Sequence, residues 1–370
     1  MANIIGAVLA SAQAGAREDL DDKIFDASPY ETPLLSSLPR EDAKNQKHEW
    51  IEDQITALTD TINEGATFSA SDTILTVSNG DRWTPNDIIL CESEYMMITA
   101  VSGNNLTVIR GWGGSTAAIH ADGSTLYKIG TAMIESADAR SANTTTRSRA
   151  YNYTQIFEHT VQVSGTTYDC VWVGGQLWLT EVDKELKEHA REINRCLYWG
   201  RRVEPTSSAR GGMGGLRQWI TSEAINRNGT CTLQQYETFL RGIIENGGHP
   251  KVAMASALGL QAINGWSEGK LQTFGGDKQF GVAVGRLMTC FGEQEVILDS
   301  QDLNLGTDDY AGEIYALQMD LLAFSQLRKT KLEKLAKAGD YESGMIITEC
   351  TLHRACEYAH GRLYNISGTA

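Results

Sequence analysis

The stretch VIRGWGGSTAAIHADGSTLYKIG, residues 108–130, brings glycines, hydroxyl side chains, His120 and Asp122 close together. Glycine-rich loops can bind phosphate through backbone N–H groups, and a histidine and an aspartate can serve as acid and base. A phosphate-binding P-loop, however, needs a lysine directly after its glycines and a helix behind it. No lysine follows 111–114, and both flanks are strand-like. We interpret the glycines as a loop between two strands, with His120 and Asp122 as turn or surface residues.

A second glycine cluster, 211–215, precedes the sequence LRQWITSEAI, which could be helical. Arg201, Arg202, Arg210 and Arg217 lie near it in the sequence. Anion binding is one interpretation, because arginines and helix N-termini both attract phosphate and carboxylate groups. The glycine content favours the other interpretation, a flexible loop between domains.

Cys350, His353, Cys356 and His360 are residue types that bind zinc. Structural zinc sites usually combine two separated pairs of ligands, whereas these four lie close together on a strand-like segment. On a strand, His353 would face away from the two cysteines. We expect buried cysteines and a surface histidine here. Because no constellation of these residue types supports catalysis, we predict no catalytic residues, no cofactor and no metal, hence no enzyme.

The composition excludes several classes of partner. The chain of 370 residues has a formal net charge of −15, which argues against broad binding to nucleic acids or anionic membranes. Its seven cysteines are scattered without a CxxC pair, which favours a reducing compartment. The N-terminus resembles a signal peptide but has no basic residue before its short apolar run, so we do not expect secretion. No apolar segment reaches the roughly 18 residues that a membrane span needs.

The elements that position these residues begin with an arm at 1–45. Prolines favour extended backbone here, yet the segment also carries Leu34, Leu35 and Leu38. An extended apolar segment without a core of its own should pack on something else, and a neighbouring subunit is the natural candidate.

Short β-prone runs then recur between Gly, Asn and Asp turns, which predicts a small all-β barrel or sandwich at 65–130. The segment lies between strand-like stretches at 47–56 and 152–163, as an insertion at the end of a long hairpin would. The runs are 73–77, 88–90, 96–101, 106–109 and 125–129.

Apolar residues recur every three or four positions over 176–200, which predicts one long amphipathic helix supported by an Asp183–Lys187 pair. A second helical stripe begins after Thr232, which with Gln235 could form a capping box. The last third is mixed α+β. Its predicted strands are 251–255, 287–290, 295–298, 313–317 and 344–352.

The order of these segments resembles the major capsid proteins of tailed phages that have the Hong Kong 97-like fold. The resemblance covers nearly the whole chain outside 65–130. It is carried by ETPLLSSLPR with HEW near the N-terminus, NYTQIFEHTVQVSGT, GGMGGLRQWI and the closing GMIITECTLHRACEYAHGRLYNI.

The resemblance implies an α+β capsid fold in which the all-β module is inserted into an extended loop, the E-loop. The implied divisions are an N-terminal arm at 1–45, the E-loop at 46–165 with the module at 65–130, a peripheral domain at 166–204 with its spine helix at 176–200, an axial domain at 205–340 and a return to the peripheral domain at 341–370.

The resemblance also implies self-assembly into hexamers and pentamers that form an icosahedral shell around the genome. Assembly would take place in the host bacterial cytoplasm, and the module would stabilise contacts between capsomers or decorate the shell. Scaffolding, portal and cement or decoration proteins are further candidate partners; no membrane and no sequence-specific nucleic acid is expected. The interface candidates are Pro33, Leu34, Leu35, Leu38, Trp50 and Trp112.

Two alternatives remain open at this point. The chain could be a tail or baseplate structural protein whose β-module binds carbohydrate, with Trp83, Tyr95 and Trp112 stacking on sugars. A hydrolase that uses His120 or the 350–360 cluster is the weaker alternative, because no constellation of residues supports it.

Overall fold

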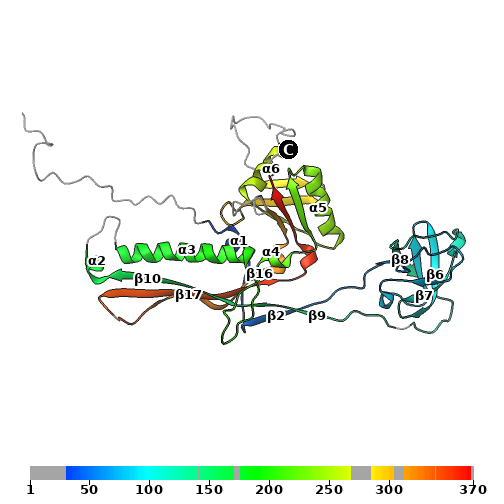
Figure 1. Ribbon diagram of the computed structural model, residues 1–370, viewed down its shortest axis with the longest axis horizontal. Coiled ribbons are helices and arrows are strands. Elements are labelled where there is room, and N and C mark those ends of the chain that lie inside the picture. Colours follow the sequence, from blue (N-terminus) through cyan, green and yellow to red (C-terminus); the bar gives the residue numbers. More distant parts are fainter. Residues whose placement is uncertain are drawn as a thin grey trace, which may run out of the picture. The chain divides into compact units, whose positions relative to one another are not determined.

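The computed structural model describes residues 31–140, 142–170, 176–267, 285–303, 312–337 and 339–367 (Figure 1). The chain divides into two compact units. The first unit consists of the residues up to Trp50 together with 150–370, and the second consists of 51–149. Residues 1–30 of the predicted arm lie outside the described residues.

The first unit contains a four-stranded sheet in the order β1-β16-β17-β10. β10 pairs antiparallel with β17 along its whole length, from Gln155 opposite Cys350 to Ser164 opposite Tyr341. β16 also pairs antiparallel with β17, whereas β1 joins β16 in parallel. The strands are β1 (Arg40–Asp42), β10 (Gln155–Ser164), β16 (Leu322–Lys334) and β17 (Tyr341–Arg354).

A long helix, α3 (Leu177–Trp199), runs along β10 and confirms the helix predicted at 176–200 (Figure 1). The Asp183–Lys187 ion pair also forms, at 2.9 Å. Only part of the predicted apolar stripe is buried, because Leu179 and Leu186 remain exposed on the helix. The helix packs on the sheet through its other apolar residues, including Trp178, Val182, Ile193 and Leu197.

A six-stranded sheet in the same unit separates two hydrophobic cores. Because side chains alternate across a strand, Ala253 and Ala255 of β12 face one core, while Met254 faces the core that contains α3. The strands, in sheet order, are β11 (Ala224–Gly229), β18 (Gly361–Ile366), β15 (Ile314–Leu317), β12 (Val252–Ala255), β14 (Gly292–Leu298) and β13 (Arg286–Thr289).

Two helices cover the first of these cores, α5 (Leu233–Glu245) and α6 (Ala257–Ser267). The predicted capping box of α5 is confirmed: the Thr232 hydroxyl accepts from the Gln235 N–H, and the Gln235 side chain accepts from the Thr232 N–H. This reciprocal pair satisfies two N–H groups that the first turn of a helix would leave without partners.

The second unit is built on a six-stranded antiparallel sheet around one apolar core. β5 shows why the sequence folds this way, because its burial alternates residue by residue as a strand with one buried face requires. The strands, in sheet order, are β3 (Thr59–Thr61), β8 (Thr125–Thr131), β5 (Asp87–Cys91), β6 (Glu94–Ser102), β7 (Asn105–Ile109) and β4 (Ile74–Thr76).

The remaining elements are short. β2 (Lys47–Glu52) and β9 (Ser148–Tyr153) form a two-stranded ribbon. The short helices are α1 (Pro33–Ser37), α2 (Gly165–Asp169), α4 (Leu216–Trp219), η2 (Gly80–Arg82), η3 (Trp112–Gly114), η5 (Met319–Leu321) and η6 (Glu357–Ala359).

Three strands pair with strands that lie outside their own predicted divisions of the chain. β10 falls within the predicted E-loop at 46–165 but is a full member of the four-stranded sheet. β16 falls within the predicted axial segment yet pairs with β17, and β18 falls within the predicted return at 341–370 yet joins the six-stranded sheet. The cause is that these pairings join segments far apart in sequence, which local periodicity does not reveal.

The arm residues Leu34 and Leu38 are buried by their own chain. Leu34 is fully buried and Leu38 nearly so, in the core formed with α3 and the four-stranded sheet. The N–H of Leu35 donates to Asn194 Oδ1 at 2.9 Å, which anchors α1 to α3. The expectation that Leu34 and Leu38 need a neighbouring subunit is therefore wrong, because folding itself supplies their partners.

Replacing Leu34 with alanine tests this anchoring. We expect the free energy of unfolding to fall by about 2–5 kcal/mol, because the substitution leaves a cavity in a packed core. The matched change Leu186→Ala, on the exposed part of α3, should cost about 0.5 kcal/mol or less. Chemical denaturation of both variants measures the difference, and equal losses would contradict the burial of Leu34.

Candidate assembly surfaces

The glycine loop of the second unit surrounds a buried carboxylate. Glu94, fully buried at the start of β6, accepts two hydrogen bonds from Arg110, at 2.7 and 2.8 Å. It also accepts from the N–H of Gly111 at 3.1 Å and of Ala118 at 2.9 Å, and contacts His120 Nε2 at 2.9 Å. The loop therefore provides the N–H groups of an anion site, but the protein's own carboxylate fills it.

The predictions for this loop are confirmed in part. It connects β7 to β8, as the interpretation of a loop between strands requires. Asp122 is an exposed turn residue that accepts from the N–H groups of Glu64 and Gly65. His120 is not at the surface: its side chain is fully buried against Glu94, so that part of the prediction is wrong.

Hydrogen bonding dominates the electrostatics of Glu94. Burial alone raises the pKa of this carboxyl, but the bonds from Arg110, Ala118, His120 and Gly111 outweigh burial and lower the pKa to about 2. Glu94 is therefore ionised at neutral pH and neutralises Arg110. A carboxylate held in this way stabilises the fold and is a poor proton donor or acceptor for catalysis.

The second glycine cluster is packed, and several of its backbone N–H groups donate within the fold. The N–H groups of Met213, Gly214 and Gly215 donate to Gln155 Oε1, Asn152 Oδ1 and the Gly200 carbonyl, respectively, at 2.8–3.1 Å. These bonds leave none of the three N–H groups for an anion. The expected flexible loop between domains is wrong as well, because the segment is buried against the C-terminal end of α3.

The four Cys and His residues at 350–360 do not converge on one point. Cys350 is buried in β17, Cys356 is exposed, and buried His360 accepts a hydrogen bond from the Gln318 N–H. Within the described ranges, no group of possible metal ligands combines any two of the four. His353 instead faces Glu41 and His48, at 3.6 and 3.0 Å.

His159 of β10 is held between two carboxylates of α3. Its Nδ1 lies 3.0 Å from Glu185 and its Nε2 lies 2.7 Å from Glu192. Burial lowers the pKa of His159, but the bonds to Glu192 and Glu185 outweigh burial and raise it. Protonated His159 is therefore an electrostatic link between the helix and the sheet. The ring centroid of His189 lies 5.2 Å from that of His159, and burial lowers the pKa of His189.

The other predicted interface residues are partly accessible. Pro33, Leu35, Trp50 and Trp112 are half-buried in their own units. Trp50 packs against His353, with ring centroids 4.6 Å apart. Trp83, one of the three candidates for sugar stacking, is buried and donates to Asp60, which leaves Tyr95 and Trp112 as accessible rings.

Large apolar side chains are exposed on the segments that flank the sheet of the second unit. Ile55 is 96% exposed, Ile134 is 82% exposed, and Ile51, Leu58 and Met133 are also exposed. Among the described residues of the second unit, no layer covers these side chains. Such a concentration typically marks a surface that another protein covers.

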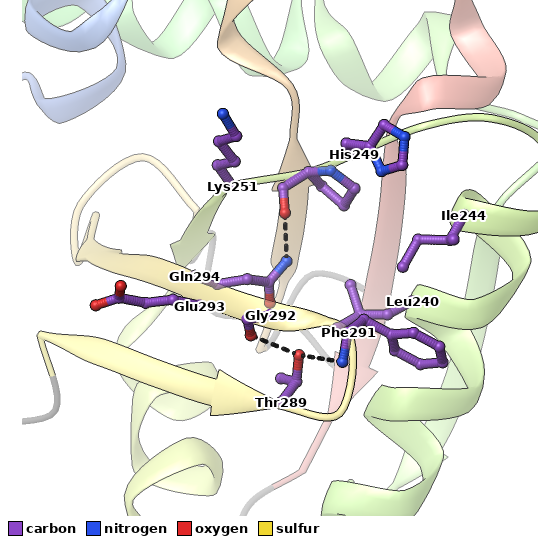
Figure 2. Close-up of a pocket in the computed structure, with 10 residues that line it drawn as sticks. Leu240, Ile244, His249, Lys251, Thr289, Phe291, Gly292, Glu293 and Gln294 are labelled. Carbon is purple, nitrogen blue, oxygen red and sulfur yellow. Dashed lines mark hydrogen bonds between the residues drawn. The ribbon is translucent and has the colours of Figure 1, made fainter.

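A cavity of about 290 Å³ lies beside the β13–β14 hairpin in the first unit (Figure 2). Its polar groups already bond within the fold: Gln294 donates to the Pro250 carbonyl, and Thr289 bonds with the backbone of Phe291 and Gly292. Figure 2 shows no convergence of the charged ends of Lys251 and Glu293. This arrangement gives no sign of an active site.

Comparison with known families decides among the interpretations left open by the sequence. A model of the SU10 major capsid protein family matches residues 6–367, nearly the whole chain. The chain belongs to this family. It is therefore a structural protein of the phage virion rather than an enzyme.

A relative supports this assignment over part of the chain. The major capsid protein of Pseudomonas phage PaMx41 is 30% identical over 186 residues, which make up 48% of this chain and 44% of that protein. The matched region thus spans less than half the length of the relative.

Three solved capsids resemble the structure of this SU10-family chain along nearly its whole length. They are the capsid of cyanophage A-1(L), with a TM-score of 0.55 at 11% identity, the empty GTA particle, with 0.53 at 8%, and Myoviridae phage XM1, with 0.51 at 10%. Each match covers 97% of this chain and 98–99% of the other. At these identities the matches show the fold alone, and they confirm the predicted Hong Kong 97-like capsid fold. Within the described part of this family member, no helix is long and apolar enough to cross a membrane.

The buried carboxylate of the SU10-family chain gives a testable prediction. Glu94→Gln leaves Arg110 buried without its counter-charge, and we expect a loss of about 3–5 kcal/mol in the free energy of unfolding. Because the pKa of Glu94 falls from 4.5 to about 2 on folding, its contribution is complete above pH 4.5 and is lost as the pH falls through 2. Denaturation at several pH values measures both effects. Glu92→Gln, at an exposed carboxylate near the same histidine, is the control.

His159 should give the opposite pH dependence. Because folding raises its pKa above 6.5, the link to Glu185 and Glu192 stabilises the fold below pH 6.5 and is lost as the pH rises through the raised value. We expect the Tm difference between the wild type and His159→Gln to be largest below pH 6.5 and to shrink at higher pH. His249→Gln, at an exposed histidine, controls for the loss of an imidazole. A Tm difference that is independent of pH would refute the link.

Proposed function

We propose that the chain assembles with copies of itself into hexameric and pentameric capsomers, which form an icosahedral shell around the phage genome. The exposed apolar side chains at 51–58 and 133–134 are the observation that carries this proposal. In a protein that functions alone, exposing them to water is unfavourable by about 25 cal/mol for each Å² of apolar surface. A second copy of the chain would remove this cost.

We assign the parts of the capsid fold from the resemblance, with their boundaries moved to match the observed sheets. The segment up to 45 serves as the N-terminal arm, and 51–149 with the β2–β9 ribbon serves as the E-loop with its inserted β-module. The four-stranded sheet and α3 serve as the peripheral domain and its spine, and the six-stranded sheet with α5 and α6 serves as the axial domain. This assignment is supported by the order of the elements along the chain.

Two roles are open to the β-module, and the accessible side chains favour contact with a neighbouring subunit over decoration of the shell. Decoration requires a polar outer surface, but Ile74, Ile109 and Ile119 are exposed on the module besides the segments that flank it. Trp112 and Trp50, each half-buried, are the candidate aromatic anchors of such contacts, since aromatic residues are enriched at protein interfaces.

The charge of the chain suits a shell around DNA. With a net charge of −15, a lining built from many copies would repel phosphate groups and leave the genome free to move during packaging and release. A portal, a separate scaffolding protein and cement proteins are further proposed partners, on the resemblance alone.

A single charge in the exposed segment tests the proposal. We expect Ile55→Asp to leave the subunit folded, because the side chain is exposed, but to reduce assembly at least about tenfold, since an interface core does not tolerate an unpaired charge. Gln54→Asp places the same charge one residue away and is the matched control. Negative-stain electron microscopy and sedimentation measure assembly.

The outcomes separate cleanly. Closed shells or capsomer rings from the wild type and from Gln54→Asp, but not from Ile55→Asp, would support the proposal. A wild type that stays monomeric at high concentration and binds glycans would instead favour a tail or baseplate protein. Normal shells from Ile55→Asp would show that this segment is not an interface.

A further inference from the structure

Three possible metal ligands lie close together near the N-terminal end of β2 in the first unit. Glu41 comes from β1, His48 from β2 and His353 from β17. His48 Nε2 lies 3.0 Å from His353 Nδ1 and 3.1 Å from Glu41 Oε1, and the third side of the triangle, from Glu41 to His353, is 3.6 Å. Segments 305 positions apart in the sequence thus place one ligand atom each at the same point.

The triangle has the dimensions of a tetrahedral zinc site. Zn²⁺ binds histidine nitrogen and carboxylate oxygen at about 2.0–2.2 Å, so neighbouring ligand atoms of a tetrahedron lie about 3.3 Å apart. The three observed sides range around this value. Two nitrogens and one carboxylate oxygen favour zinc over magnesium or calcium, which prefer ligand sets made of oxygen.

The hydrogen-bonding capacity of the three ligand atoms also favours a cation at this point. Each atom can direct a lone pair toward the centre of the group, but one proton at the centre can bridge only two of the three atoms. A divalent cation satisfies all three together. The tautomers then follow, since His48 coordinates through Nε2 and His353 through Nδ1, which leaves the proton of each ring on its other nitrogen.

The surroundings hold the ligands in place and leave one side open. Ser325 donates to Glu41 Oε1 at 2.9 Å, and the Trp50 ring packs against the His353 ring. Such outer contacts orient metal ligands. The side chains of His48 and His353 are 15% and 22% exposed, and that of Glu41 is 41% exposed, so an ion can enter from solvent.

We propose that Glu41, His48 and His353 bind one Zn²⁺ ion, with water as the fourth ligand. The ion would link β1 at the end of the arm and β2 of the ribbon to β17. Its role would be structural, because it adds stability only while the three strands remain packed on one another.

A second group of possible ligands serves as the internal comparison. His159, Glu185 and Glu188 also lie within reach of one another, but this group offers one nitrogen and two carboxylates. His159 is already paired through both ring nitrogens with Glu185 and Glu192. We therefore assign zinc to the Glu41 group.

The test is calorimetric titration of the chelator-treated full chain with ZnCl₂. We expect about one site per subunit. Removing a ligand in His48→Ala or His353→Ala should weaken binding by more than the roughly 10–100-fold that loss of an outer-shell partner costs. Glu41→Gln preserves the shape of the side chain and should also weaken binding. His249→Ala should bind as the wild type does, and circular dichroism confirms that each variant is folded.

Cobalt provides a second readout, which reports the coordination geometry of the bound ion. Co²⁺ in the same site should give the intense visible absorption of a tetrahedral ion, and His48→Ala should abolish that absorption. Zinc binding that persists in the His48→Ala and His353→Ala variants would overturn the proposal, as would binding that is lost only in His159→Ala. No measurable binding by the folded wild type would also overturn it. Failure of shell assembly affects none of these readouts.

Discussion

The first unit depends on the close approach of the glycine segment 211–215 to the C-terminal end of α3. A Cβ atom on Gly200 would lie 2.4 Å from the Met213 carbonyl oxygen, and one on Gly215 would lie 2.7 Å from that of Tyr198. Only glycine allows this contact. The approach lets Asn152 bond with both Gly214 and the Leu352 carbonyl, so helix, ribbon and sheet are joined at one buried point.

Both glycine-rich segments look like ligand sites for the same physical reason. Glycine exposes backbone N–H groups to close approach, which is what an anion needs and equally what a buried side chain of the same protein needs. Here Glu94 occupies one set of N–H groups, and Asn152 and Gln155 occupy the other. Sequence alone cannot tell an external anion from an internal acceptor, because the acceptors lie 17–62 positions away along the chain.

Local patterns in the sequence predicted the elements whose stability is local. The long helix predicted at 176–200, the capping box at Thr232 and the β-prone runs of the second unit depend on periodicity and on nearest neighbours, and the structure contains all of them. β16 was missed because its first half is buried and its second half is exposed, so neither half shows alternation. The burial of Leu34 and the Glu41–His48–His353 triangle were missed because long-range packing creates both.

Shell assembly requires both rigid units and exposed apolar surfaces that only a neighbouring copy can cover. Buried pairs such as Glu94–Arg110 and the Asn194 bridge between α1 and Asp302 add little net stability over apolar packing, but they tolerate only one geometry. A closed shell needs subunits of one fixed geometry, because small angular errors accumulate over many copies. In the proposed assembly, the free energy of association would come from the apolar side chains at 51–58 and 133–134, each worth about 1.5–3 kcal/mol when buried. Since each copy repeats the same contact, modest contacts suffice to hold the shell.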